Sequence, residues 1–369
     1  MKNEICEGRV KKLIEVLKKN EIDGYLCGLS ENAYYFSNFY GTGKERFHGL
    51  FIPSVGDIVF LIAGLNETFV RNSTWIDNII TWNEGEDPFE KIASIIKKRK
   101  LSMSKIAVDD VLRSDQLLAL QEKLPQVKFI SGGEFTSALR RIKSNDEKDL
   151  MMHLGSIQDK ATKNAISAIQ VGVSEREIAD IIENTFKEFG AKYAGVTPNV
   201  ASGFYSTNPH HYALSEKLIE DGDSVILDFT GEWKHYKSDS TRTVFVGNPP
   251  KEYLKIYNTV KKAQEMAVKS VKPGRTCEEI DRIARKIIED EGYGQYFIHR
   301  TGHGIGLEIH EEPYITEGNK LVLEPGMTFS VEPGIYFPPK YGVRIEDIVI
   351  VTEKGAEPFT NLSHDLVIK

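Results

Sequence analysis

Four acidic residues in the C-terminal half of the chain lie inside apolar segments that favour β-strands. The segments are SVILDF, SDSTRTVFV, MTFSVEPGIYF and VRIEDIVIV, and the acidic residues are Asp228, Asp239, Glu332 and Glu346. Taken singly, each is best explained as a strand-end carboxylate that faces water. Together they need a stronger explanation, because a carboxylate in an apolar setting costs free energy unless a partner compensates its charge.

The spacing of these residues predicts two pairs. Asp228 and Asp239 lie on neighbouring predicted strands that are joined by a turn at residues 231–237. Glu332 and Glu346 lie on a second pair of segments that is also joined by a turn. Strands that fold back on each other bring side chains of one face close together. Clustered carboxylates are driven to protonate unless cations neutralise them, so the pattern predicts a site for two divalent ions.

A glycine-rich segment, HRTGHGIGLEIHEEP at residues 299–313, adds two histidines to this set. His303 stands between Gly302 and Gly304, where little side-chain bulk would block the approach of an ion, and His310 follows seven residues later. Neutral imidazole is a common metal ligand and a proton carrier. The alternatives are a flexible turn or a phosphate-binding loop, but the pattern is GxGxG rather than GxGxxG. The alternation of the intervening run predicts that both imidazoles face one cavity.

The remaining histidines are less informative. His210 and His211 follow Pro209 in a predicted loop. A lone loop histidine is more often structural or exposed than catalytic. That interpretation applies to His48, His153, His235, His299 and His364.

The elements that must position these residues follow from capping signals and apolar periodicity. Capping boxes predict helix starts at Ser144 with Glu147, Ser174 with Glu177, and Thr276 with Glu279. Strands are expected from about residue 224 to 246 and again near the C-terminus. Helices with strands inserted between and after them predict an α+β domain with an antiparallel sheet, covering residues 141–369.

The N-terminal residues 1–140 predict a smaller α/β domain. Helical patterns alternate with short apolar runs at residues 25–29, 50–52, 58–63, 106–108 and 127–130. Helices are expected near the N-terminus and at residues 89–97 and 114–123. A chain of 369 residues also favours two domains over one.

Composition excludes several classes of protein. The net charge is −7 with both signs interleaved, which gives no reason to expect nucleic acid or an anionic membrane as a partner. The longest apolar stretch, residues 58–65, is too short to span a bilayer. The 3 cysteines are widely spaced, which argues against a disulfide framework or a cysteine-based zinc site. The N-terminus shows no signal-peptide pattern, so we expect a cytoplasmic protein.

The ordered motifs resemble a known family. They read VASG…PH, LDF…SDSTRT, RTGHGIGLEIHEEP, SVEPGIY and VRIEDIVIV, across roughly residues 145–369. In order and spacing they are similar to the pita-bread metallopeptidases, specifically the aminopeptidase P and prolidase branch. The segment IDGYLCGLSENAYYFSNFYG also resembles the extra N-terminal domain of that branch.

The resemblance implies a role for each matching residue. Asp228 would bind one metal, His303 and Glu332 would hold the second, and Asp239 and Glu346 would bridge both. His210 and His310 would contact the substrate and the developing oxyanion. Glu332 would also carry a proton to the leaving nitrogen. In the surroundings of the metals, Thr241 would orient Asp239 and Arg344 would hold a carboxylate.

The same resemblance implies hydrolysis of the peptide bond that precedes proline in short peptides, by a hydroxide bridging two divalent ions. Manganese(II) or cobalt(II) is expected, with zinc(II) or iron(II) as alternatives. A homodimer is expected. The competing interpretations are a metal-free creatinase, a methionine aminopeptidase or other peptidase of the same fold, and a non-catalytic pita-bread module that binds peptides. The complete ligand set argues against the first and the last, and the N-terminal domain argues against the second.

Two positions depart from the family pattern. Prolidases often carry an arginine four residues after the second histidine, where it holds the free carboxylate of a dipeptide; here that substrate-binding position is Tyr314. The tyrosine therefore favours aminopeptidase action on longer Xaa-Pro peptides over strict dipeptidase action. Thr230 stands where glycine is usual, and the sequence does not predict its effect.

Overall fold

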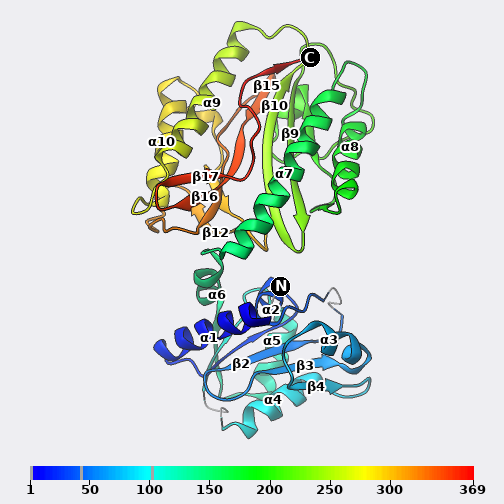
Figure 1. Cartoon of the computed structure of the whole chain (residues 1–369), viewed down its shortest axis with the longest axis vertical. Helices are drawn as coiled ribbons and strands as arrows, with labels where there is room; N and C mark the ends of the chain where they lie inside the picture. The colour runs from blue at the N-terminus through cyan, green and yellow to red at the C-terminus, as the bar shows by residue number, and fades with distance from the viewer. Residues whose placement is uncertain (1–2, 42–44, 101–103) are drawn as a thin grey trace. The chain divides into compact units, whose positions relative to one another are not determined.

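The computed structural model describes residues 3–41, 45–100 and 104–369. The chain divides into two compact units, Met1–Arg140 and Arg141–Lys369 (Figure 1). Each unit has its own sheet and its own apolar core.

The first unit is built on a six-stranded mixed sheet. In spatial order its strands are β4 (Ile79–Trp82), β3 (Val59–Ala63), β2 (Gly49–Pro53), β1 (Gly24–Cys27), β5 (Lys105–Val108) and β6 (Lys128–Ser131). Its helices are α1 (Asn3–Lys19), α2 (Glu31–Ser37), α3 (Glu67–Ser73), α4 (Pro88–Lys98), α5 (Ser114–Lys123) and α6 (Gly133–Arg140). Apolar side chains of α4 and α5 pack on one face of the sheet and form the core of this unit.

The apolar runs predict most of this unit, and the α/β class is confirmed. They do not predict β4 or the helices α2, α3 and α6. These helices have only 7 or 8 residues, which is about two turns and too short for a clear 3.6-residue period. In β4 only Trp82 is buried, so the strand lacks the apolar run of its neighbours.

The second unit has a larger sheet whose main path is antiparallel. The path runs β12 (Glu311–Ile315), β11 (Gly302–Gly304), β13 (Thr328–Val331), β16 (Glu346–Thr352), β10 (Tyr236–Phe245), β9 (Ser224–Trp233) and β7 (Lys192–Tyr193). Beside it lie β8 (Asn199–Ser202), β17 (Gly355–Pro358) and β18 (Val367–Ile368), and β14 (Gly334–Phe337) pairs with β15 (Tyr341–Arg344). The predicted α+β class is therefore confirmed.

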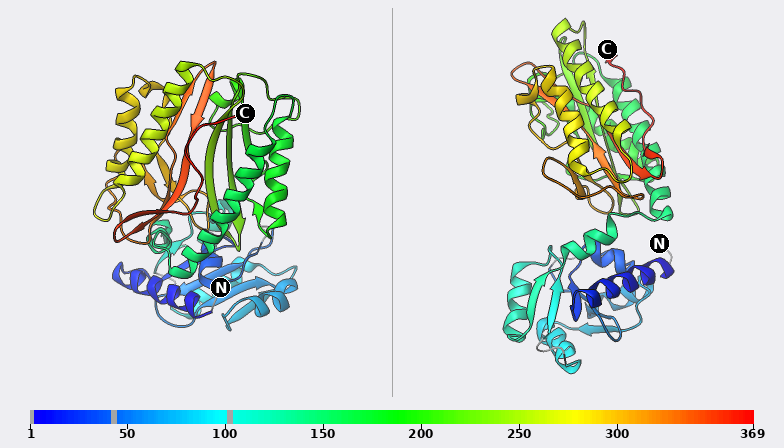
Figure 2. Two further views of the ribbon diagram at one scale, coloured as in Figure 1. Left: turned by 45° about the horizontal axis from the view of Figure 1, so that its top comes forward. Right: turned by 90° about the vertical axis from the view of Figure 1, so that its left-hand side faces the viewer.

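Four long helices cover this sheet: α7 (Asn145–Ala168), α8 (Glu175–Glu188), α9 (Lys251–Ser270) and α10 (Cys277–Asp290). In both views of Figure 2 the green pair, α7 and α8, and the yellow pair, α9 and α10, lie against the strands. The three predicted capping boxes are all present and open α7, α8 and α10. Along the described ranges, no helix combines the length and the apolar character needed to cross a membrane.

The packing of α7 and α8 decides which face of the sheet carries the polar residues. Val225, Leu227 and Phe229 of β9 belong to the apolar core beneath these helices. Successive strand residues point to opposite faces, so Asp228 points away from the helices. The opposite face of the sheet is therefore where the site can form.

Candidate metal centre

The hairpin of β9 and β10 brings the first two carboxylates together. Asp228 is the register partner of Thr241, and Asp239 is the register partner of Thr230. Since the side-chain period of a strand is 2, all four side chains share the face opposite α7 and α8. The two aspartates thus lie diagonally across the pair, as the spacing predicts.

The turn of this hairpin is tighter than predicted. The predicted turn at residues 231–237 is wrong in extent, because β9 continues to Trp233 and β10 begins at Tyr236. Lys234 and His235 alone form the turn, both with left-handed backbone, at φ 49° and 70°. Two-residue turns with positive φ match the twist of the flanking strands, so they define the register of the two aspartates closely.

Glu346 and Glu332 come from the next strands of the sheet. Glu346 is the register partner of Thr241 and therefore shares the face of the aspartates. Glu332 follows Val331, the last residue of β13, which is the register partner of Asp347. The predicted strand pair that carries both glutamates is interrupted, because β14 and β15 leave it to form a separate two-stranded sheet. Both glutamates lie at this interruption.

His303 is the central residue of β11, and its flanking glycines are needed for the packing of neighbouring backbones. A Cβ on Gly302 would lie 1.8 Å from the Ser330 carbonyl oxygen, and one on Gly304 would lie 2.3 Å from the Glu312 carbonyl. The glycines therefore allow the neighbouring backbones to approach. That they also leave room for an ion beside His303 stays a prediction.

His310 reaches the same place by an irregular route. The run between the two histidines is not an alternating strand, because β11 ends at Gly304 and β12 begins only at Glu311. The rings of His303 and His310 nevertheless meet edge to face, with centroids 4.2 Å apart. The predicted neighbourhood of the two imidazoles is present, although the alternation that predicted it is not.

Two of the carboxylates are short of hydrogen-bond donors. Asp239 and Glu346 are 6% and 1% exposed. In each of them one buried oxygen, Oδ1 of Asp239 and Oε1 of Glu346, has no hydrogen-bond partner. Burial and the charge of Asp228 raise the pKa of Asp239 to about 7. Burial and the charges of Asp239 and Glu332 raise the pKa of Glu346 well above its usual range.

The other pair in the site, Glu332 and His303, is well matched. His303 Nε2 lies 3.2 Å from Glu332 Oε1. Burial alone would raise the pKa of Glu332, but the hydrogen bond and charge of His303 lower it to about 2. Burial likewise opposes the charge on His303, and the Glu332 contact outweighs it, so the pKa of His303 is raised.

These features fit a cation. Ligand atoms of Asp239, His303 and Glu346 lie within 4.8 Å of one another. Oxygen and imidazole donors suit a divalent ion, and its charge would satisfy the unpartnered oxygens. Glu332 adjoins the group through His303. Asp228 lies near enough for its charge to contribute to the raised pKa of Asp239.

Hydroxyl and guanidinium groups hold these carboxylates from behind. Arg344 forms an ion pair with Asp228 and also donates from Nε to Thr241 Oγ1 at 3.2 Å. Thr241 donates to Glu346 Oε2 at 2.7 Å, so the expectation that it orients Asp239 is wrong. The residue that donates to Asp239 is Thr230, at 3.1 Å from Oδ2. Register explains the exchange, because Thr241 is the partner of Glu346 and Thr230 is the partner of Asp239.

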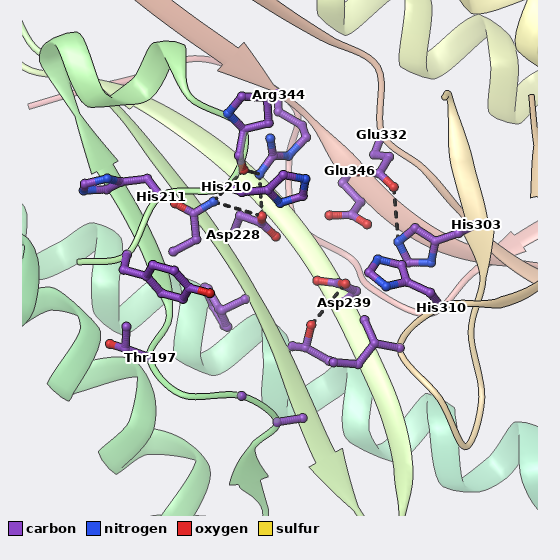
Figure 3. A pocket seen from close by; sticks show the side chains of 18 of the residues that line it. Thr197, His210, His211, Asp228, Asp239, His303, His310, Glu332, Arg344 and Glu346 are labelled. Atoms are coloured by element: carbon purple, nitrogen blue, oxygen red, sulfur yellow. Dashed lines mark hydrogen bonds and ion pairs between the residues drawn. The ribbon is translucent and has the colours of Figure 1, made fainter. Parts of the chain in front are cut away.

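The carboxylates line a cavity of about 650 Å³. Figure 3 shows the rings of His210 and His211 pointing in opposite directions, with His210 turned toward the carboxylates. His211 Nε2 lies 2.8 Å from Oε2 of the fully buried Glu175. The carbonyl of Pro209 accepts from Asn199 at 2.9 Å. The loop is thus held on both sides of His210.

Several residues of the cavity were not expected from the sequence. His299 lines it and lies 2.9 Å from the Tyr336 hydroxyl, although its motif position predicts only a structural role. Arg300 also lines the cavity. Tyr314 lies outside the lining, beneath the Arg300 guanidinium, at 4.5 Å from ring centroid to Cζ. The sequence could have indicated Arg300 by its positive charge, because it stands three residues before His303.

Comparison with known proteins gives consistent matches. Residues 149–353 match metallopeptidase family M24, and residues 9–142 match the Creatinase/Prolidase N-terminal domain. A protein named Xaa-Pro dipeptidase from Pyrococcus furiosus is 36% identical over 360 residues, which cover 97% of this chain and 99% of that protein.

Solved structures agree with these matches. A recombinant prolidase from Thermococcus sibiricus has a TM-score of 0.94 at 38% identity, covering 100% of both chains. An X-Pro aminopeptidase from Thermotoga maritima has a TM-score of 0.86 at 30% identity, covering 98% of this chain and 99% of that one.

Proposed function

This chain belongs to metallopeptidase family M24, and from that premise we propose that it hydrolyses the peptide bond preceding proline in short peptides. The resemblance drawn from the motifs is thereby confirmed at the level of the family. Relatives named Xaa-Pro dipeptidase, prolidase and X-Pro aminopeptidase match nearly the whole chain at 30–38% identity. The observation that carries the proposal is the pair of buried, under-partnered carboxylates beside His303.

Two divalent ions would be held by Asp228, Asp239, His303, Glu332 and Glu346. When bound, they would lower the pKa of a coordinated water and polarise the scissile carbonyl. Carboxylate oxygens and one imidazole support manganese(II) or cobalt(II) over a metal that prefers thiolates.

The protein's own groups would move the proton and receive the charge. Glu332 lines the cavity with Oε1 3.2 Å from His303 Nε2, and its carboxylate would accept a proton there and pass it to the leaving nitrogen of proline. The pKa of His310 is lowered to about 4 by desolvation in the cavity and by the nearby charges of His303 and Arg300. A neutral His310 can donate its ring N–H to the carbonyl oxygen as negative charge develops there. His210 would contact the substrate from the opposite side.

Proline distinguishes the substrate because its imide lacks a hydrogen-bond donor. The bond before proline has no N–H to donate, and the ring restricts φ. A peptidase that relies on the missing N–H cannot use such a bond. A site whose donors act on the carbonyl, as His310 would, does not need it.

Turnover with defined metal content tests the proposal. The protein would be stripped with a chelator, reloaded with manganese(II) or cobalt(II), and assayed on Ala-Pro and Ala-Ala with metal measured by elemental analysis. Strong preference for Ala-Pro with two ions per chain is expected. Equal cleavage of both would indicate a peptidase of other specificity. Two bound ions without turnover of any peptide would indicate a binding module.

We also propose that the protein is a cytoplasmic homodimer. The support is the sequence pattern and the family resemblance. Sedimentation at micromolar concentration should give about twice the mass of one chain, and a monomer would contradict the proposal.

A further inference from the structure

The two arginines of the cavity are bound very differently. Arg344 is 3% exposed, and its guanidinium contacts Asp228, Thr241, Tyr336 and the Pro209 carbonyl. Its charge and its donors are therefore committed to the protein. It holds the site in shape and has little left for a ligand.

Arg300 is the opposite case. Its side chain is half-buried, lines the cavity, and rests on the Tyr314 ring at 4.5 Å. Over the residues that the structure describes, the Arg300 guanidinium has neither a hydrogen-bond acceptor nor a carboxylate partner. A guanidinium carries five N–H donors in a planar fork. Within the described residues, no protein acceptor takes up these donors.

The position of Arg300 is well defined without such a partner. Tyr314 lies in β12, where it is the register partner of His303. Its carbonyl accepts from Asn319 Nδ2 at 2.6 Å, which fixes the backbone below the ring. A cation over an aromatic face is stabilised by the ring quadrupole, and arginine stacks well because it is planar. The Tyr314 ring therefore holds the guanidinium in place without using its N–H donors.

Arg300 lies in the same cavity as the reacting groups, because it lines that cavity together with His303 and His310. Two divalent ions would balance the four carboxylates, which leaves the charges of Arg344 and Arg300. Arg344 is already held by protein groups, so of the two, Arg300 is the one whose donors a ligand can use.

We propose that Arg300 is the specificity-determining residue that binds the free C-terminal carboxylate of an Xaa-Pro dipeptide. This inference rests on the proposed function and narrows it to dipeptidase action. In such a dipeptide the carboxylate is attached to the proline Cα, next to the scissile nitrogen, so its partner must lie close to the reacting bond. The fork of arginine matches a carboxylate in geometry and charge. Tyr314 then acts as the platform for the cation, and the expected preference for longer peptides is reversed.

The experiment compares Ala-Pro with its uncharged amide, Ala-Pro-NH2, in the manganese-loaded enzyme. In Arg300→Gln, the ratio of kcat/KM for Ala-Pro to that for the amide should fall about 10- to 100-fold, the usual effect of losing a hydrogen bond to a charged group. Arg300→Lys, which keeps the charge but loses the fork, should fall between wild type and Arg300→Gln. Tyr314→Leu should lower the ratio less than Arg300→Gln.

Arg282→Gln is the matched control, because Arg282 is exposed, pairs with Glu317 and lies outside the cavity lining. It should keep the wild-type ratio, and metal content should be the same in every variant. Equal loss on both substrates in Arg300→Gln, leaving the ratio constant, would overturn the role of Arg300. Failure of the wild type to prefer Ala-Pro over Ala-Ala would instead refute the proposed function.

Discussion

Glu346 and Asp347 are consecutive residues of β16, are both almost fully buried, and have opposite surroundings. Glu346 faces the cavity, receives one hydroxyl donor on Oε2, and leaves Oε1 without a partner. Asp347 faces the helices and receives four donors. They come from Arg242, Gln264, Thr360 and His364 at 2.6–2.9 Å.

The pKa values of Glu346 and Asp347 shift in opposite directions because the two carboxylates receive different numbers of hydrogen-bond donors. Burial raises the pKa of Glu346 and would also raise that of Asp347. The charge of Arg242 and the contact with His364 outweigh burial at Asp347, so its pKa is lowered instead. A buried carboxylate with a full set of donors is a structural element, while one that lacks donors is prepared for a cation. The two faces of one strand thus separate stability from chemistry.

The largest effect should come from removing a charge on the cavity face. Glu346→Gln or Asp239→Asn should bring turnover below detection and reduce metal content, because each removes a ligand charge. The metal-free variant should be no less stable than metal-free wild type, since the lost charge was poorly compensated. Elemental analysis, kinetics and urea unfolding decide this. Near-wild-type turnover with manganese(II) would contradict the assignment of these residues as ligands.

His310→Ala should come next in size and should separate ligands from other residues of the cavity face. Loss of one oxyanion donor typically costs about 10²–10³ in kcat. Metal content should remain at two ions per chain. His303→Ala, measured alongside, should lose metal and turnover together. Metal loss in His310→Ala comparable to that in His303→Ala would remove the distinction.

On the helix face, Asp347→Asn should damage stability. Removing one partner of a buried charged pair leaves Arg242 uncompensated, which typically costs about 3–5 kcal/mol. Asp290→Asn is the control, because Asp290 pairs with Lys286 at the surface and should cost about 0–1 kcal/mol. Urea unfolding measures both. Unchanged stability of Asp347→Asn would mean that donor number does not distinguish the faces.

The comparison also shows what the sequence can and cannot predict. Spacing alone placed Asp228 and Asp239 on one hairpin, because a strand has a period of 2 and the turn is short. The capping boxes predicted three helix starts, because their contacts are local. In VRIEDIVIV, however, Glu346 and Asp347 are adjacent in one apolar run, and what separates their roles is the set of donors that each receives.

The features that the sequence does not predict depend on contacts between residues far apart in the chain. The donors of Asp347 lie between 13 and 105 residues away along the chain, so no local pattern reveals them. The role proposed for Arg300 likewise depends on its contact with the Tyr314 ring in β12, which no local pattern reveals. The error over Thr241 has the same origin, because register, rather than closeness in sequence, decides which carboxylate it contacts.

The pH dependence of the metal-free protein should show both faces at once. Asp239 has a raised pKa of about 7, so stability should decrease as pH rises from its unfolded value, near 4, to about 7, by an amount on the order of 4 kcal/mol. Asp347 has a lowered pKa, so its contribution should be present above pH 4 and lost as pH falls below it. Urea unfolding against pH should therefore pass through a maximum. Asp239→Asn should reduce the decrease on the neutral side, where the raised pKa of Glu346 also contributes, and leave the acid side unchanged. An unchanged profile would contradict the raised pKa of Asp239.

The smallest expected effects come from two buried threonines, each of which donates one hydroxyl hydrogen bond to Glu346 or to Asp347. Thr241 donates to Glu346 at 2.7 Å, and Thr360 donates to Asp347 at 2.8 Å. Valine has nearly the same shape and removes only the hydroxyl. Thr241→Val should lower manganese affinity about 10-fold, the lower end for a residue that orients a ligand, because Glu346 then loses its single donor. Thr360→Val should leave affinity unchanged and cost about 1 kcal/mol of stability, because Asp347 keeps three donors. Chelator-buffered metal titration and urea unfolding of both variants measure the two effects, and double-mutant cycles with Glu346→Gln and Asp347→Asn assign each to its carboxylate. If Thr360→Val weakens manganese binding as much as Thr241→Val does, the backbone of β16 couples the two faces, and the separation of stability from chemistry fails.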